Sequence, residues 1–233
     1  MSSSCPIAPP FPTALKLKTF SLKAGTNLVR CHKTGDPKNT FPANSFNPNV
    51  GKRITVPEEG ARFNPFPGAP ATNIPTLYAA TSLEAAALES IFHEVPHQPS
   101  QKYPKTQLAE WSYSELNVTR DLTLFELVNS RLRPLKVPGR QSITEQELIQ
   151  TPPTEYPRTR TWACNLHALI PGLDGLAWRP RLGGTGTAYV FFGDRFKPDD
   201  LKILGRAISA ADGVGYKEIE RIAEWADIEI VTP

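Results

Sequence analysis

The 233-residue sequence predicts a mixed α+β fold, with a largely antiparallel sheet core and flanking helices. Two observations lead to this class. Apolar segments of strand length recur along the whole chain, and most connections between them are too short for the helical crossover that parallel pairing needs. A third observation is the composition: 24 prolines and 15 glycines indicate long loops and few helices, while 39% apolar residues suffice for a core.

Residues 1–14 are rich in Ser and Pro and are expected to form a flexible N-terminal arm, so that residues 15–233 make a single domain. Residues 33–59 have little periodicity and are interpreted as a long loop that is either functional or mobile. Strands are predicted over residues 14–20, 26–32, 76–80, 108–118, 121–128, 175–179, 187–193, 201–204 and 228–231. Helices are predicted after Thr81 and over residues 144–150, 160–170 and 215–226.

Charge and cysteine content narrow the function classes. The net charge of +3 favours no nucleic-acid partner, although it suits anionic small molecules. The cysteines Cys5, Cys31 and Cys164 are odd in number and form no CxxC pair, which is typical of a reducing compartment. No signal peptide and no membrane-spanning run are evident, so we expect a cytoplasmic protein without membrane contact.

The stretch from Gly60 to His97 is the most informative part of the chain. Its helix is predicted to begin with a Thr81–Glu84 capping box and to stop at Pro96. The helix is apolar nearly all round, which predicts burial. Glu84 is explained as part of the cap, whereas Glu89 would place a carboxylate among apolar neighbours without a structural reason.

Arg62, Tyr78 and Glu89 together suit one chemistry if they meet at a cleft. An arginine binds phosphate, a tyrosine offers a flat ring and a hydroxyl, and a buried carboxylate stabilises an oxocarbenium-like centre. The residue types alone leave open a purely structural reading, with a surface Arg62, a core Tyr78 and an ion-paired Glu89. No metal is expected, because Glu89 and His93 have no third ligand nearby.

The ordered motifs resemble the RES domain over roughly residues 25–210. They are Arg30, Gly60-Ala61-Arg62-Phe63-Asn64-Pro65, Leu77-Tyr78-Ala79-Ala80, Ala87-Leu88-Glu89, Gly175-Leu176-Ala177-Trp178-Arg179-Pro180-Arg181 and Tyr189-Val190-Phe191-Phe192-Gly193-Asp194-Arg195. The resemblance implies a fold similar to that of ADP-ribosyltransferase toxins, and makes residues 15–233 a single RES-like catalytic domain.

The resemblance also implies a function. Family members are typically toxins of bacterial toxin–antitoxin pairs that cleave the nicotinamide–ribose bond of NAD by phosphorolysis or hydrolysis, or transfer ADP-ribose to a protein. NAD is then the substrate, inorganic phosphate a co-substrate, and an Xre-type antitoxin the partner with which the chain assembles. Arg30 and Arg62 would bind the NAD phosphates and ribose, Tyr78 would contact the nicotinamide side, and Glu89 would be the catalytic carboxylate.

One position departs from the family pattern. Pro180 stands where the family usually has a serine, and a proline offers neither a hydroxyl nor a backbone N–H. Thr185 or Thr187 could supply a hydroxyl, and their spacing does not decide between them. A non-catalytic nucleotide-binding module therefore stays an alternative, beside NAD cleavage and protein ADP-ribosylation. If the enzyme reading holds, Glu89→Gln should abolish turnover while leaving the fold intact.

Overall fold

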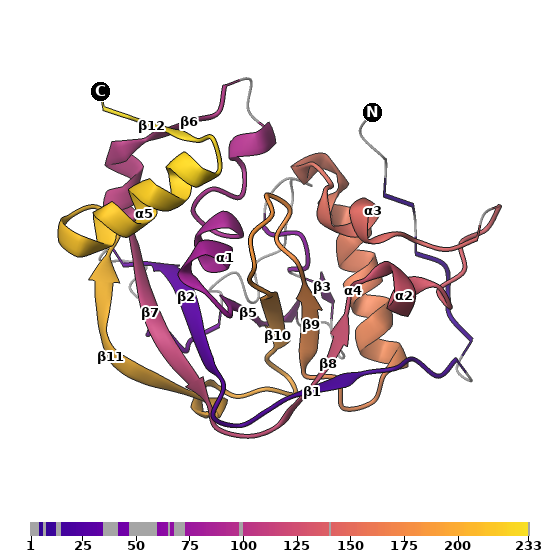
Figure 1. Cartoon of the computed structure of the whole chain (residues 1–233). Helices are drawn as coiled ribbons and strands as arrows, with labels where there is room; N and C mark the ends of the chain where they lie inside the picture. The colour runs from indigo at the N-terminus through magenta and orange to yellow at the C-terminus, as the bar shows by residue number, and fades with distance from the viewer. Residues whose placement is uncertain are drawn as a thin grey trace.

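The computed structural model describes residues 5–6, 8–12, 15–34, 42–46, 60–64, 66–67, 73–97, 100–139 and 141–232. Eight strands form one curled sheet in the order β1-β8-β9-β10-β5-β2-β7-β11 (Figure 1). These strands are β1 (Phe20–Leu22), β2 (Asn27–Lys33), β5 (Thr76–Ala80), β7 (Trp111–Val118), β8 (Leu122–Glu126), β9 (Gly175–Trp178), β10 (Ala188–Phe192) and β11 (Leu201–Ser209).

Two small sheets and five α-helices complete the described part of the chain. The small sheets pair β3 (Phe66–Pro67) with β4 (Asn73–Ile74), and β6 (Lys102–Pro104) with β12 (Glu229–Val231). The helices are α1 (Leu83–Leu88), α2 (Asn129–Leu132), α3 (Glu145–Ile149), α4 (Tyr156–Leu169) and α5 (Gly213–Trp225). Short 3-10 turns lie at η1 (Val95–His97), η2 (Lys105–Glu110), η3 (Pro153–Glu155) and η4 (Pro198–Asp200).

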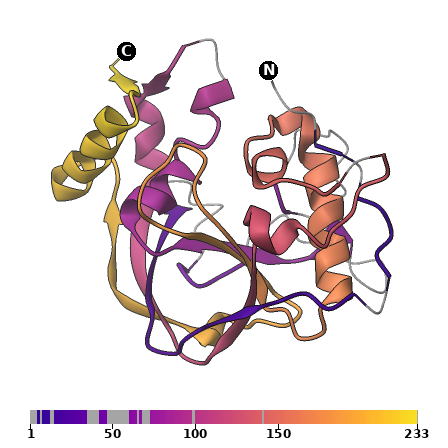
Figure 2. The same ribbon diagram turned by 45° about the vertical axis from the view of Figure 1, so that its right-hand side comes forward.

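Neighbouring strands of the large sheet are antiparallel, except for the parallel pair β8–β9. The chain between β8 and β9 contains α2, α3 and α4, which is the helical crossover that a parallel pair requires. The β2–β5 junction has a single paired position, Val29 with Ala80. Figure 2 shows the sheet curling around its own axis, so the mixed and largely antiparallel α+β prediction is confirmed.

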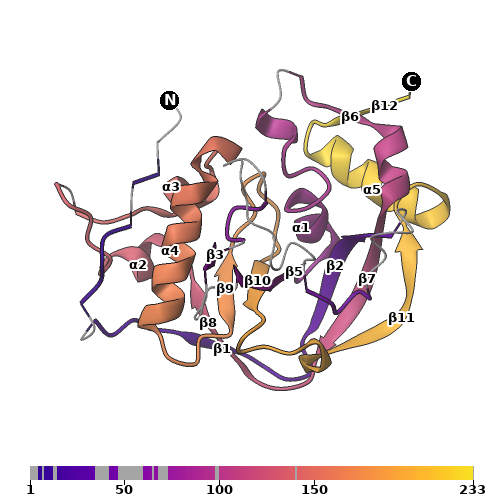
Figure 3. The ribbon, with the colours of Figure 1, turned by 180° about the vertical axis from the view of Figure 1, so that it is seen from behind.

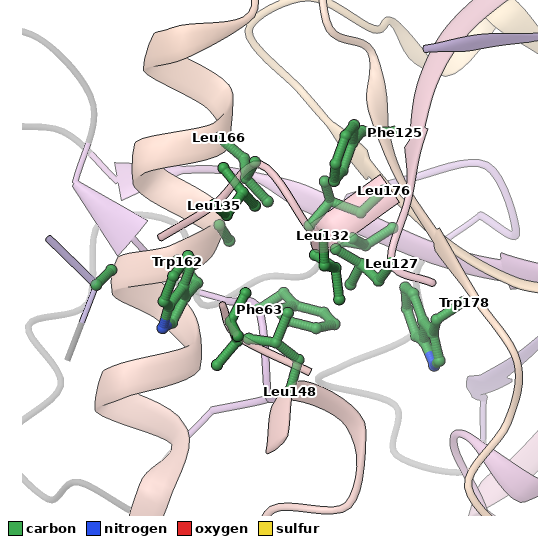
Figure 4. Close-up of a cluster of buried hydrophobic side chains, with 14 of the residues drawn as sticks. Phe63, Phe125, Leu127, Leu132, Leu135, Leu148, Trp162, Leu166, Leu176 and Trp178 are labelled. Carbon is green, nitrogen blue, oxygen red and sulfur yellow. The ribbon is translucent and has the colours of Figure 1, made fainter. Parts of the chain in front are cut away.

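Helices cover the sheet at two separate places. α1 and α5 pack together over the β2 and β7 side, and α4 lies beside the β8 and β9 side (Figures 1 and 3). The buried cluster under α4 includes Phe63, Trp162 and Trp178, which Figure 4 labels. A second cluster lies under α1 and α5, and a third on the opposite face of the sheet, with Leu77 and Ala79 of β5. The site described below lies between the first two clusters.

Most predicted elements are present with shifted ends. Helix α4 begins four residues earlier than predicted, because Pro157 is in the first turn, where its missing N–H costs nothing. Strand β11 continues to Ser209, beyond the predicted Leu204. The predicted strand over residues 14–20 is wrong: of its described residues only Phe20 is in β1, whose three residues pair with Leu122–Leu124 of the short strand β8.

The predicted cap of the central helix is also wrong. Ser82 is the N-cap, and its side-chain oxygen accepts a hydrogen bond from the Ala85 N–H. Thr81 is not available for this role, because its hydroxyl oxygen accepts from the Thr187 N–H and so joins the ends of β5 and β10. Glu84 is therefore an acidic residue of the first turn, and the helix ends at Leu88, with Glu89 as its C-cap.

The described residues of the N-terminal segment contact α4. Cys5 is buried, and the backbone oxygens of Pro6 and Pro9 accept hydrogen bonds from Trp162 and Asn165. The division into a flexible arm (1–14) and one domain (15–233) stays a prediction. Most of the loop predicted over residues 33–59 lies outside the described residues. Within the described ranges, no helix combines the length and apolarity needed to span a membrane.

Candidate active site

Strand β5, the turn after α1 and a tight turn at residues 61–64 bring Tyr78, Glu89 and Arg62 together. The turn is closed by two backbone hydrogen bonds between Ala61 and Asn64. Arg62 Nη1 donates to Glu89 Oε2 at 3.0 Å, and the two side chains are only 2% and 6% exposed. The three residues therefore lie together, as a buried ion pair beside a tyrosine. An ion-paired Glu89 also fits the purely structural reading, whereas Arg62 is buried and not on the surface as that reading supposed.

Glu89 is held by donors on both of its oxygens. The backbone N–H of Arg181 donates to Oε1 at 3.1 Å, opposite the Arg62 contact on Oε2. Burial has the largest single effect on the pKa of Glu89 and would raise it, but Arg62, His93, the Arg181 amide and the nearby Trp178 indole together lower it below its ordinary value. The Trp178 N–H is close enough to act on the carboxylate but is not aligned as a hydrogen bond. Glu89 is thus ionised at neutral pH.

Tyr78 stays a neutral phenol. Its hydroxyl oxygen accepts a hydrogen bond from the Phe63 N–H at 3.1 Å. Its ring meets Trp178 edge to face, with centroids 6.0 Å apart. Burial is the main reason that the pKa of Tyr78 is raised. Its phenolic proton is therefore retained and can be donated to a neighbouring acceptor.

Helix α4 fixes the turn that carries Arg62. Thr159 donates its hydroxyl to the Arg62 carbonyl oxygen, and Arg160 Nε donates to the Ala61 oxygen at 3.1 Å. Two buried nitrogens of Arg62, Nε and Nη2, have no hydrogen-bond partner among the residues that the structure describes. Buried donors are nearly always paired in folded proteins, so this pair is suited to an acceptor-rich ligand.

Arg30 is not part of this cluster. Residues of a strand alternate between the two faces of the sheet, and Val29 packs on the same side as its partner Ala80. Arg30 is therefore on the opposite face from Tyr78, where its Nη1 donates to the backbone oxygens of Ala43 and Ser45. Burial lowers the pKa of Arg30 to about 10, so it remains charged. Its role in phosphate binding stays a prediction.

The position of the missing serine lies next to the site. Pro180 is buried, and the following residue, Arg181, supplies the amide that holds Glu89. Thr187 donates its N–H to Thr81 at the start of β10, and Thr185 is exposed. Among the described residues, no group of three His, Cys, Asp or Glu side chains is arranged to hold a metal ion.

Four site residues were not identified from the sequence as such: Thr159, Arg160, Trp178 and Arg181. One available signal was Arg160, a charge within the first turns of a helix whose other side is apolar. The second was Arg181, placed between a proline and a glycine-rich run. Neither signal specifies a contact, because the partners are more than 80 residues away in the chain.

Comparisons with known proteins agree with this architecture. No curated protein matches the chain. A chain of the M. tuberculosis MbcT–MbcA toxin–antitoxin complex has a similar fold, with a TM-score of 0.51 and 15% sequence identity over 86% of this chain and 92% of that one. The family model of the RES domain matches residues 28–209, which include Arg30, Arg62, Tyr78 and Glu89. The chain belongs to the RES domain family.

Proposed function

We propose that the protein cleaves the nicotinamide–ribose bond of NAD, with phosphate or water as the acceptor. The observation that carries the proposal is the ionised Glu89 carboxylate, buried between Arg62 and the Arg181 amide. Cleavage of an N-glycosidic bond develops positive charge on the ribose, and a fixed carboxylate in a site of low dielectric stabilises that charge. Glu89 would act electrostatically, because its pKa is too low for a proton donor at neutral pH.

The other groups of the site fit a dinucleotide. Arg62 donates to Glu89 through Nη1, and its Nε and Nη2 could donate to phosphate or ribose oxygens of the substrate. Tyr78 supplies a neutral hydroxyl and an aromatic ring beside Trp178, which suits the planar nicotinamide. Arg62 and the Glu89 carboxylate together match a substrate with an anionic pyrophosphate and a cationic ring.

The assay is loss of NAD and release of nicotinamide by purified protein, with and without phosphate. Glu89→Gln should abolish turnover, and Glu84→Gln is the matched control, since it makes the same chemical change on α1 outside the site. Glu89→Gln leaves the buried Arg62 facing an amide in place of a carboxylate, so it is expected to lower the stability of the fold. Its unfolding curve is therefore measured first, and a folded, fully active Glu89→Gln would reject the assignment.

Pro180 favours a second candidate, a non-catalytic nucleotide-binding module. Saturable NAD binding without turnover would identify this module. Pro180→Ser tests the point directly, because a gain of activity would show that the missing hydroxyl limits catalysis. Labelled ADP-ribose on a protein band would instead identify an ADP-ribosyltransferase.

We further propose that the protein acts in the cytoplasm as the toxin of a toxin–antitoxin pair, with an Xre-type antitoxin as partner. Support comes from membership of the RES family and from the toxin–antitoxin complex to which the fold is similar. Induced expression should arrest growth of a bacterial host, and Glu89→Gln should relieve the arrest. Normal growth while wild-type protein accumulates would contradict the toxin role.

A further inference from the structure

The loop between β9 and β10, residues 179–187, lies against the start of α1. A Cβ atom at Gly184, where φ is +92°, would be 2.2 Å from Glu84 Oε1, and one at Gly186 would be 2.6 Å from Ala85 Cβ and Ser82 Oγ. At Gly186 the contacts are with short, fixed side chains, so a larger residue does not fit there. At Gly184 the Glu84 carboxylate could move aside, and it is the positive φ that favours glycine. The loop is thus fitted closely to the element that precedes Glu89.

Arg181 ties this loop to the turn after α1 at two points. Its backbone N–H donates to Glu89 Oε1 at 3.1 Å, and its side-chain Nη2 donates to the backbone oxygen of His93 at 2.8 Å. Both acceptors belong to the segment that leaves α1. The Arg181 side chain therefore contacts His93 at the far end of this turn, while the Arg181 amide contacts the Glu89 carboxylate at its start.

This arrangement places a second guanidinium near that of Arg62. Burial, followed by repulsion from Arg62, lowers the pKa of Arg181, while Glu89 acts in the opposite direction. Burying two like charges around one carboxylate costs free energy, and such an arrangement is more typical of a functional site than of a loop that only connects two strands.

We propose that Arg181 is a positioning residue for Glu89: its side chain, anchored on His93, keeps its amide on Oε1 and so fixes the orientation of the carboxylate. The proposal rests on the proposed function only in taking Glu89 as the catalytic carboxylate. Three other groups face Glu89: Arg62 from the 61–64 turn, Trp178 from β9, and the imidazole of His93. Without the side-chain anchor on His93, the Arg181 amide is free to leave Oε1, and the carboxylate can then rotate about its remaining hydrogen bond to Arg62.

Arg181→Ala tests the proposal, and Arg179→Ala is the matched control. Arg179 carries the same charge two residues earlier, but it is exposed and acts on Glu145 of α3 instead, where burial raises the pKa of the carboxyl and Arg179 opposes part of that rise. For Arg181→Ala we expect kcat to fall roughly ten- to hundredfold with little change in KM, because a misplaced group costs about this much in rate. The acid limb of the kcat–pH profile should shift to higher pH. Arg179→Ala should change neither.

A second readout is independent of activity. The pKa of Glu89 is measured by ¹³C NMR of its side-chain carboxyl, assigned with Glu89→Gln, and it should rise in Arg181→Ala. An unchanged titration of Glu89 in that variant would overturn the proposal, whatever the kinetics. A wild type without NAD turnover would reject the proposed function, and the NMR comparison would still decide whether Arg181 controls Glu89.

Folding of the alanine variant is checked by circular dichroism. Should it fail to fold, Arg181→Met replaces it, because methionine keeps much of the apolar stem but cannot donate to the His93 oxygen. A rise in the pKa of Glu89 in Arg181→Met supports the proposal, and an unchanged value overturns it.

Discussion

The buried Arg62–Glu89 pair predicts an unusual effect of pH on the stability of one variant, Arg62→Met. The N–O distance of 3.0 Å gives a gross attraction of about 5 to 6 kcal/mol at an effective dielectric constant of about 20. Two effects offset part of this loss: Glu89 keeps its Arg181 donor, and the unpaired Nε and Nη2 of Arg62 disappear. The net loss at pH 7 is therefore expected near 3 kcal/mol, about the range for breaking a buried pair.

The pH dependence of the contribution that Glu89 makes to stability should have opposite signs in the wild type and in Arg62→Met. In the wild type the pKa of Glu89 is below the ordinary 4.5, so the ionised pair stabilises the fold above pH 4.5, and this stability is lost as pH falls through the folded pKa. In Arg62→Met, the largest effect that lowers the pKa of Glu89 is lost, so the effect of burial dominates and the folded pKa rises above the unfolded value. Its carboxylate then destabilises the fold at pH 7 and is relieved by protonation as pH falls.

Urea unfolding followed by circular dichroism at pH 7 and pH 5 measures both effects. The deficit of Arg62→Met relative to wild type should be about 3 kcal/mol at pH 7 and smaller at pH 5. The double variant Arg62→Met/Glu89→Gln is the control and should recover part of the loss at pH 7. A deficit below about 0.5 kcal/mol, within the usual range for surface substitutions, or one equal at both pH values, would refute the reasoning.

Three other predictions use the same unfolding assay. Ser82→Ala should cost about 1 kcal/mol by removing the N-cap of α1, and no loss would leave Thr81 as the cap. Gly184→Ala should cost about 1 to 2 kcal/mol, because φ is +92° there, and an unchanged stability would contradict the need for glycine at this position. Burial, then Arg30, lowers the pKa of His32 from 6.5 to about 4, so the unfolded chain binds protons first and stability should fall as pH drops from 6.5 toward 4. His32→Gln should flatten that decline, and an identical decline would exclude His32 as its source.

Local patterns in the sequence predicted a strand over residues 187–193, which is β10, and a helix over residues 144–150, which is α3 with a capping box of Thr144 and Glu147. They also identified Glu89 as a buried carboxylate without a local role. They could not give its partners, because the Arg62 turn, α4 and the 179–187 loop meet only through tertiary contacts. The N-cap error had the same origin: Thr81 and Ser82 are both good caps, and the distant Thr187 amide decides between them.

The large sheet is weakest between β2 and β5, where the two strands share a single paired position. Every other neighbouring pair of strands shares at least three positions, so separation at this junction breaks the fewest ladder contacts. α1 packs against both β2 and β5 and thus bridges the two halves. The halves are expected to behave as separate cooperative units in amide exchange, with α1 as the hinge between them. Glu89 is the C-cap of that helix, so its hydrogen bonds to Arg62 and Arg181 would change with the angle between the halves.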